Sequence, residues 1–135
     1  MLKFLNQKST KIFEIVVSKI DQNGYKKFES DSNCFMALVV ERIGKADLLG
    51  TSWELYSFAH YYEQNGDLMR DPEMCFAYDA VSKRVFPYYF RMDGSIPVEQ
   101  ESVSFENGGY TPHTQRDHAL FANTWMKNIK YQQNL

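Results

Sequence analysis

The densest group of side chains that could do chemistry lies between residues 60 and 73. His60 and Glu63 are followed closely by Asp67, Asp71 and Glu73, and imidazole and carboxylate groups serve both as metal ligands and as general acids or bases. In a strand, however, residues three positions apart point to opposite faces of the sheet. The spacing therefore favours a histidine that is hydrogen-bonded within a strand, followed by solvent-exposed acidic residues in a turn. The alternative is an enzyme that uses the His60 to Glu73 region.

The other histidines and the cysteines are dispersed. His113 and His118 flank the start of a C-terminal helical segment, and Cys34 and Cys75 each precede a phenylalanine in an apolar run and form no C-x-x-C pair. A thiol in such surroundings is poorly ionised. We expect that both thiols lie in the core and that the protein binds no metal and no cofactor. The sequence assigns no catalytic residue.

Several aromatic residues could form a stacking platform for single-stranded nucleic acid on a sheet. They are Tyr56, Tyr61, Tyr62, Tyr88, Tyr89 and Phe90. Such a platform needs lysine or arginine beside it, and the stretch from Tyr56 to Tyr62 has none. Packing within the core and on the sheet is the favoured interpretation, and a nucleic-acid accessory protein is a second alternative.

The composition indicates one domain over residues 1–135. The formal net charge is −2, with 44% hydrophobic and 16% aromatic residues, which suits a chain that buries its own core and does not suit general binding to nucleic acid or anionic membranes. Residues 1–27 hold six lysines, whereas residues 54–79 hold six acids and one arginine. With two unpaired cysteines and no long apolar run, we expect a cytoplasmic protein.

Helical periodicity marks both ends of the chain. Between Ser9 and Gln22, apolar residues recur every three or four positions, which predicts a helix. Ser9 is its expected N-cap, and Asn23-Gly24 is expected to end it. The apolar positions are Ile12, Ile15, Val16 and Ile20. The C-terminal helix is expected to begin near Thr114, which would form a capping box with Asp117. One of its faces carries Phe121, Ala122, Trp125 and Ile129.

Runs of β-branched and aromatic residues fill the region between the helices. The expected strands are 25–30, 35–43, 53–63, 74–78, 84–91 and 98–105, separated by turn residues such as Asp31-Ser32-Asn33, Asn65-Gly66-Asp67, Asp93-Gly94 and Asn107-Gly108-Gly109. Short strands at this spacing predict an antiparallel meander. The fold class is therefore α+β, an antiparallel sheet of about five or six strands with the N-terminal and C-terminal helices packed on one face.

One long segment carries a resemblance to a known family. The stretch from His60 to Met74, HYYEQNGDLMRDPEM, is supported by GYKKFES at 24–30, CFMAL at 34–38, ENG at 106–108 and FANTW at 121–125. The sequence resembles a family of small proteins, without assigned activity, that are carried by bacterial plasmids, conjugative elements and phages. The resemblance implies a genomic setting and transfers no catalytic residues.

Mobile elements carry many small proteins that block host defence nucleases by binding them. The resemblance therefore implies a non-enzymatic binding protein of a mobile element or phage, and specifically an inhibitor of a host defence nuclease such as a CRISPR effector or a restriction enzyme. Its partner would be a host protein such as a defence nuclease, rather than a membrane or nucleic acid.

The same segment is the expected docking site. Asn65-Gly66-Asp67 favours a tight turn and Pro72 restrains its far end, so that the turn would project. A projecting acidic turn suits a basic protein surface. The candidate binding residues are Tyr62, Glu63, Asn65, Asp67, Leu68, Met69, Arg70, Asp71 and Glu73.

Overall fold

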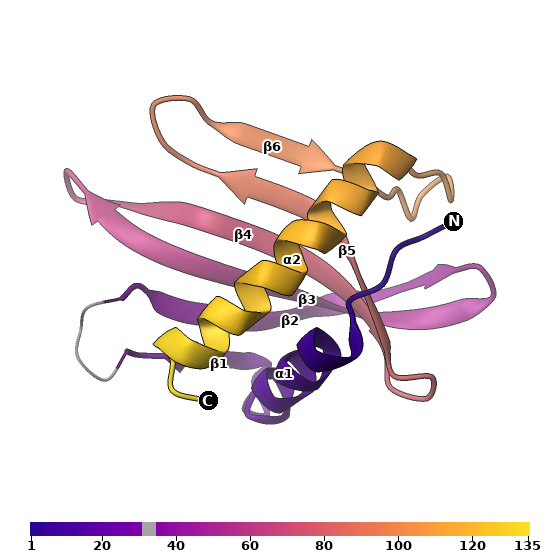
Figure 1. Ribbon diagram of the computed structural model, residues 1–135, viewed down its shortest axis with the longest axis horizontal. Coiled ribbons are helices and arrows are strands. Elements are labelled where there is room, and N and C mark those ends of the chain that lie inside the picture. Colours follow the sequence, from indigo (N-terminus) through magenta and orange to yellow (C-terminus); the bar gives the residue numbers. More distant parts are fainter. Residues whose placement is uncertain (31–34) are drawn as a thin grey trace.

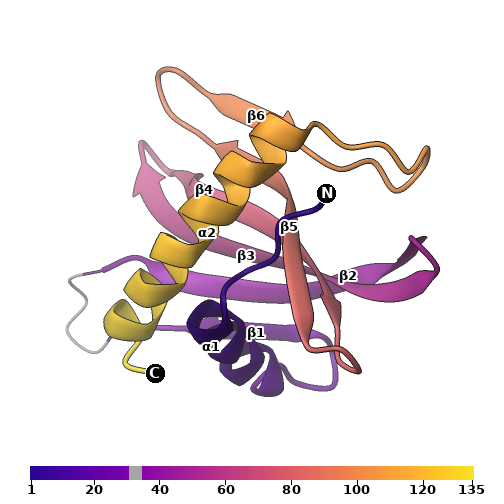
Figure 2. The same ribbon diagram turned by 45° about the vertical axis from the view of Figure 1, so that its right-hand side comes forward.

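A computed structural model describes residues 1–30 and 35–135. It shows a six-stranded antiparallel sheet in which strand order follows chain order, and both helices lie on the same face of that sheet (Figures 1 and 2). The elements are α1 (Gln7–Ser18), β1 (Tyr25–Phe28), β2 (Ala37–Leu48), β3 (Thr51–Gln64), β4 (Asp67–Asp79), β5 (Arg84–Met92), β6 (Val98–Glu101) and α2 (Pro112–Gln132). The predicted fold class is confirmed, whereas the expected turn at 31–33 lies outside the described residues.

Both helices begin before their predicted caps. The side chain of Asn6 accepts a hydrogen bond from the backbone N–H of Ser9 at 2.8 Å, so Asn6 is the N-cap of α1 and Ser9 lies inside the helix. Since α1 ends at Ser18, Asn23-Gly24 belongs to the turn before β1. Helix α2 starts at Pro112, because proline suits the first helical position and needs no N–H partner there. The predicted capping box of Thr114 and Asp117 was therefore wrong, because Thr114 lies inside the helix.

All six strands differ somewhat in their bounds from the prediction, and β2, β4 and β6 show the largest shift at one end. Strand β2 continues through a bulge beyond Arg42 to Leu48, and β4 begins at Asp67 rather than at Met74. Strand β6 ends at Glu101, because the following residues close over one end of the sheet. Further bulges occur in β4 near Pro72 and in β5 near Pro87, where a proline is tolerated because the ladder is already interrupted.

The helices cover the larger of two cores. Phe13 and Val16 from α1 and Trp125, Met126 and Ile129 from α2 pack on side chains from β2, β3 and β4. The predicted helix stripes are thus largely buried, but Ile15 is 44% exposed and Phe121 is 39% exposed. Among the described residues, no helix combines the length and apolar character needed to cross a membrane.

A smaller core lies on the opposite face at one end of the sheet. Phe76 and Val85 belong to the first core, whereas their neighbours Ala77 and Phe86 belong to the second, because successive strand residues point to opposite faces. Trp53 packs on Phe86 with ring centroids 4.9 Å apart. Within residues 1–30 and 35–135, no helix covers the rest of this second face, because both helices lie on the other one (Figure 2).

Candidate functional site

The part of the sheet without helices, here called the open face, is defined by cross-strand rows. One row runs Lys27, Val39, Ala59, Glu73, Arg91 and Glu99 from β1 to β6, and the next runs Tyr25, Glu41, Ser57, Cys75, Tyr89 and Glu101. Directly paired residues of an antiparallel sheet share a face. Each of the six strands therefore contributes at least one polar side chain to the open face.

A bulge in β4 brings two charged residues onto this face. Ala59 pairs with Glu73 and Tyr61 pairs with Arg70, so β4 places one more residue between these pairs than β3 does. In a regular strand Arg70 and Glu73 would point to opposite faces. The extra residue of the bulge restores them to the same side, where Arg70 Nε lies 3.1 Å from Glu73 Oε1.

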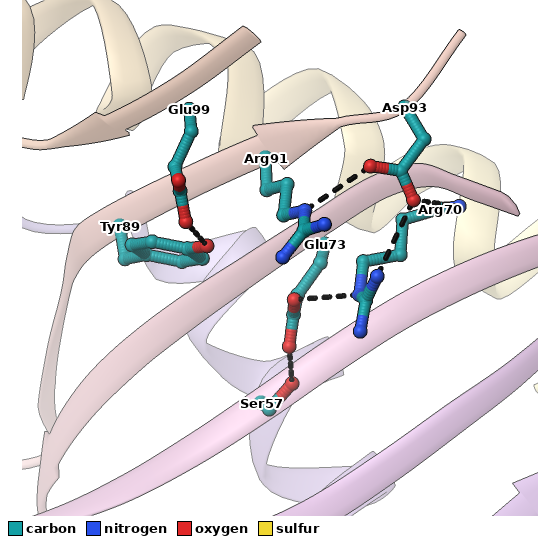
Figure 3. A network of polar contacts seen from close by, with 7 residues as sticks. All are labelled: Ser57, Arg70, Glu73, Tyr89, Arg91, Asp93 and Glu99. Carbon is teal, nitrogen blue, oxygen red and sulfur yellow. Dashed lines mark hydrogen bonds and ion pairs between the residues drawn. The ribbon is translucent and has the colours of Figure 1, made fainter. Parts of the chain in front are cut away.

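These residues belong to a network of polar contacts (Figure 3). Asp93 Oδ2 accepts hydrogen bonds from the Arg70 backbone N–H at 3.0 Å and from Arg70 Nη1 at 3.3 Å, and its Oδ1 accepts one from Arg91 Nε at 3.1 Å. Ser57 donates to Glu73 Oε2 at 2.7 Å. The Nε–H of Arg70 is not directed at Glu73, so that contact is an ion pair without a hydrogen bond.

The backbone N–H of Arg70 is the main reason why the pKa of Asp93 lies below its ordinary value, with Arg91 adding to the effect. Asp93 is thereby held ionised and ties β4 to the end of β5. At the edge of the network, Tyr89 donates its phenolic hydrogen to Glu99. Burial, reinforced by that carboxylate, raises the pKa of Tyr89 to about 12, so its hydroxyl remains a donor at neutral pH.

The open face carries an excess of negative charge. Glu73 and Asp93 are compensated by arginines, and Lys27 is paired with Glu29 at 3.1 Å. Within residues 1–30 and 35–135, four further glutamates of this face form no ion pair. They are Glu41, Glu63, Glu99 and Glu101, and all four are exposed.

A pocket of about 460 Å³ lies on the open face where β1, β2 and the β3–β4 hairpin meet. Its lining consists of three tyrosines, two glutamates, Lys27 and small or aliphatic side chains. The tyrosines are Tyr25, Tyr61 and Tyr62, and the glutamates are Glu41 and Glu63. Arg70 already places its guanidinium 5.9 Å from the ring centre of Tyr61, so this aromatic surface receives a cation within the protein itself.

The predicted docking segment is a β-hairpin rather than a projecting turn. Asn65 and Gly66, both with positive φ, form the two-residue connection between β3 and β4. Residues 67–73 belong to β4, because this segment pairs with β3. Its members divide by environment: Tyr62, Glu63 and Leu68 line the pocket, and Arg70 and Glu73 join the network. Asn65 and Asp67 are exposed, while Met69 and Asp71 are half-buried.

His60 and Glu63 diverge as the strand spacing predicted. His60 is 2% exposed beneath α2, and Glu63 is exposed on the open face. His60 Nε2 donates to Gln133 Oε1 at 3.1 Å, and His60 Nδ1 accepts from Trp125 Nε1 at 3.0 Å. Because an indole N–H only donates and an amide oxygen only accepts, these partners fix a neutral imidazole. Burial lowers the pKa of His60 accordingly.

The other two histidines have separate environments. His118 is buried on α2 between Ser102 and Gln100, at 2.9 Å and 3.2 Å, and burial lowers its pKa. His113 is exposed and lies 3.4 Å from Asp117. No group of three histidine, cysteine or carboxylate side chains in the described part of the chain is arranged to hold a metal ion.

Cys75 is the core thiol that was predicted, although it is buried from the open-face side. Burial raises its pKa to about 12, and a hydrogen bond with Tyr88 only partly opposes that effect. Such a thiol is protonated at neutral pH and is a poor nucleophile. Cys34 lies outside the described residues.

The aromatic residues proposed as a stacking platform do not share one surface. Tyr56 is buried under α1, and Phe90 packs against His118 and Phe121 of α2. Tyr88 belongs to the smaller core. Tyr61 and Tyr89 lie on the open face, and Tyr62 contributes to the pocket. Core packing therefore accounts for three of the six, and the other three lie on the open face or in its pocket.

The open face also includes residues that sequence reasoning missed. Ser57, Arg91, Asp93 and Glu99 complete the network, and Lys27 and Glu41 complete the pocket. Alternation along each strand indicates which residues share its face, but it does not give the register between strands. Pro72 and Pro87 were the available signals, since prolines inside strands indicate bulges.

The architecture is that of an α+β protein with an antiparallel meander, one face covered by two terminal helices and the other left largely open. The chain belongs to the family described as Domain of unknown function (DUF6908), whose model matches residues 7–135. No curated protein matches the sequence, and no solved structure matches it either.

Proposed function

We propose that this protein is a non-enzymatic binding protein that recognises a basic protein surface through the open face of its sheet. The observation that carries the proposal is the set of exposed glutamates on that face that form no ion pair among the described residues. Fixed carboxylates on a rigid sheet speed association with a positively charged partner and help to orient it.

The pocket supplies an anchor for one side chain of the partner. Tyr25, Tyr61 and Tyr62 offer aromatic surface, and Glu41 and Glu63 offer charge at the same place. An arginine or lysine side chain from the partner fits this combination, because its charge is attracted both by aromatic rings and by carboxylates. Lys27 leaves the pocket net negative, since it is a single cation opposite two acids and is itself paired with Glu29.

The partner we propose is a host defence nuclease, such as a CRISPR effector or a restriction enzyme, in the bacterial cytoplasm. Two considerations support this choice: the resemblance to proteins of plasmids, conjugative elements and phages, and the basic channels that nucleases use to hold phosphates. A protein surface with fixed carboxylates can occupy such a channel in place of nucleic acid. Inhibition would then need no catalytic group on this chain.

The test couples capture to inhibition. The purified protein is used to capture partners from a bacterial lysate, and each captured nuclease is then assayed for DNA cleavage with increasing amounts of the protein. The double variant Glu41→Lys/Glu63→Lys reverses two charges of the pocket, and Asp47→Lys/Glu106→Lys makes the same change of charge at exposed sites outside it.

We expect the pocket variant to lose capture and inhibition and the control to retain both. A captured nuclease that still cleaves DNA at its full rate would contradict the proposed inhibition, but it would agree with the proposed binding. Equal capture by both variants would remove the open-face pocket from the interface.

A further inference from the structure

A second groove lies on the opposite side of the molecule, between the outer surfaces of the two helices. It has a volume of about 510 Å³. Ile12 and Ile15 of α1 form its apolar part, and Ile15 is 44% exposed. This surface is separated from the open face by the sheet and the larger core (Figure 2), so it takes no part in the function proposed above.

Four lysines line the groove: Lys8 and Lys11 from α1 and Lys127 and Lys130 from α2. All four are exposed, and none forms an ion pair with another residue of the described chain. Neither acid of the two helices forms an ion pair with these lysines. Glu14 accepts a hydrogen bond from Tyr78 at 2.6 Å, and Asp117 lies beside His113 near the other end of α2.

The contact between the two helices fixes the backbone positions of the two pairs of lysines relative to each other. They meet where Ser9 Oγ donates to the backbone oxygen of Asn123 at 3.3 Å, and the side chain of Asn123 also accepts from the Asn6 N–H at 3.0 Å. Lys127 and Lys130 follow Asn123 by about one and two helical turns. Within each pair the lysines are three residues apart, which places them on one side of their helix.

We propose that this groove binds an acidic amphipathic segment of a partner protein. An apolar side chain of the segment packs on Ile15, and carboxylates spaced about one helical turn apart pair with lysines of both helices. The combination of exposed isoleucine and flanking lysines favours a peptide over a nucleic acid. Single-stranded nucleic acid is held by aromatic side chains that stack on its bases, and none of the described residues that line this groove is aromatic.

The probe is a fluorescent peptide of about 14 residues, close to four helical turns, with leucines at three- and four-residue spacing and glutamates between them. Binding is measured by fluorescence anisotropy. A second peptide replaces the leucines with serines at the same charge. A single strand of DNA of about 20 nucleotides, longer than the roughly 4–16 nucleotides that one OB fold covers, serves as the competing polyanion.

Three forms of the protein are compared: wild type, Lys8→Gln/Lys127→Gln/Lys130→Gln, and the control Lys26→Gln/Lys45→Gln/Lys83→Gln. Both variants lose the same charge, and the control lysines are exposed residues outside the groove. A fourth form, Ile15→Asn, changes the apolar part alone. Far-ultraviolet circular dichroism and thermal melts check that every variant is folded.

We expect the leucine peptide to bind wild type and control equally and to bind the groove variant about tenfold more weakly. The serine peptide and the Ile15→Asn protein should each show a similar loss. Equal binding by the groove variant and the control would overturn the site. Binding of the DNA strand that is tighter than that of the peptide and indifferent to Ile15→Asn would overturn the peptide as the occupant.

Discussion

The two faces of the sheet are built from alternate residues of the same strands, yet they treat polar groups in opposite ways. On the covered face, His60 is neutral and fully hydrogen-bonded beneath α2. On the open face, Arg70 forms ion pairs with Glu73 and Asp93, and its backbone N–H lowers the pKa of Asp93. Burial without a counter-charge favours the neutral form, whereas partial exposure with a partner favours the ionised form. The position of the helices thus determines which chemistry each face can support.

The largest expected effect comes from breaking the covered face. Trp125→Ala removes a side chain that is 3% exposed and also removes the donor to His60 Nδ1. Cavity formation should lower the free energy of unfolding by about 3–5 kcal/mol, measured by urea denaturation. Phe121→Ala, on the same helix but 39% exposed, is the matched control and should cost clearly less. Equal losses would mean that α2 does not pack as described.

Removing the central acceptor of the open-face network should have a smaller effect. Asp93→Ala deletes the acceptor of the Arg70 N–H and of both arginine side chains. Because these groups lie near solvent, we expect a loss of about 1 kcal/mol, again by urea denaturation. High salt should reduce the difference between the variant and wild type, since screening weakens the same ion pairs. A salt-independent difference would instead point to the lost backbone hydrogen bond.

Acid should weaken the covered face before the open face. The pKa values of His60 and His118 are lowered by burial, so the unfolded chain takes up protons first as the pH falls. Stability should therefore be greatest above about pH 6.5 and decrease below it. His60→Gln can still accept from Trp125 and does not titrate. Its free energy of unfolding should fall less between about pH 7 and 5, and an unchanged slope would contradict the role of His60.

The smallest effect is expected at the exposed edge of the open face. Glu99→Gln/Glu101→Gln removes two charges of β6 that form no ion pair among the described residues. The glutamine at 99 can still accept the hydrogen bond of Tyr89, so the free energy of unfolding should change by less than about 0.5 kcal/mol. Thermal unfolding by circular dichroism is sufficient to check this. A loss as large as that of Asp93→Ala would show that the hydrogen bond from Tyr89 to Glu99, or the charge of Glu101, contributes substantially to stability, and would argue against a free carboxylate surface on β6.

The sequence predicted the elements better than it predicted the site. Helical periodicity located Val16, Ala122, Trp125 and Ile129 in the core, because a repeat of three or four residues is a local property. The network of Arg70 and Glu73 depends on one extra residue in β4, which changes the pairing of every residue beyond it. No local pattern gives the register of neighbouring strands, so the composition of the open face could not be read in advance.

The sequential strand order also bears on how the chain reaches this structure. Each strand pairs with the strand that precedes or follows it in the chain, so the sheet can grow by adding one hairpin at a time, with little loop-closure entropy at each step. The longest-range contacts join the ends of the chain, as in the hydrogen bond between Asn6 and Asn123. The transition state for folding should therefore contain central hairpins, and docking of the two helices should follow it. Substitutions at the helix crossing would then mainly accelerate unfolding, whereas substitutions in the β3–β4 hairpin would slow folding.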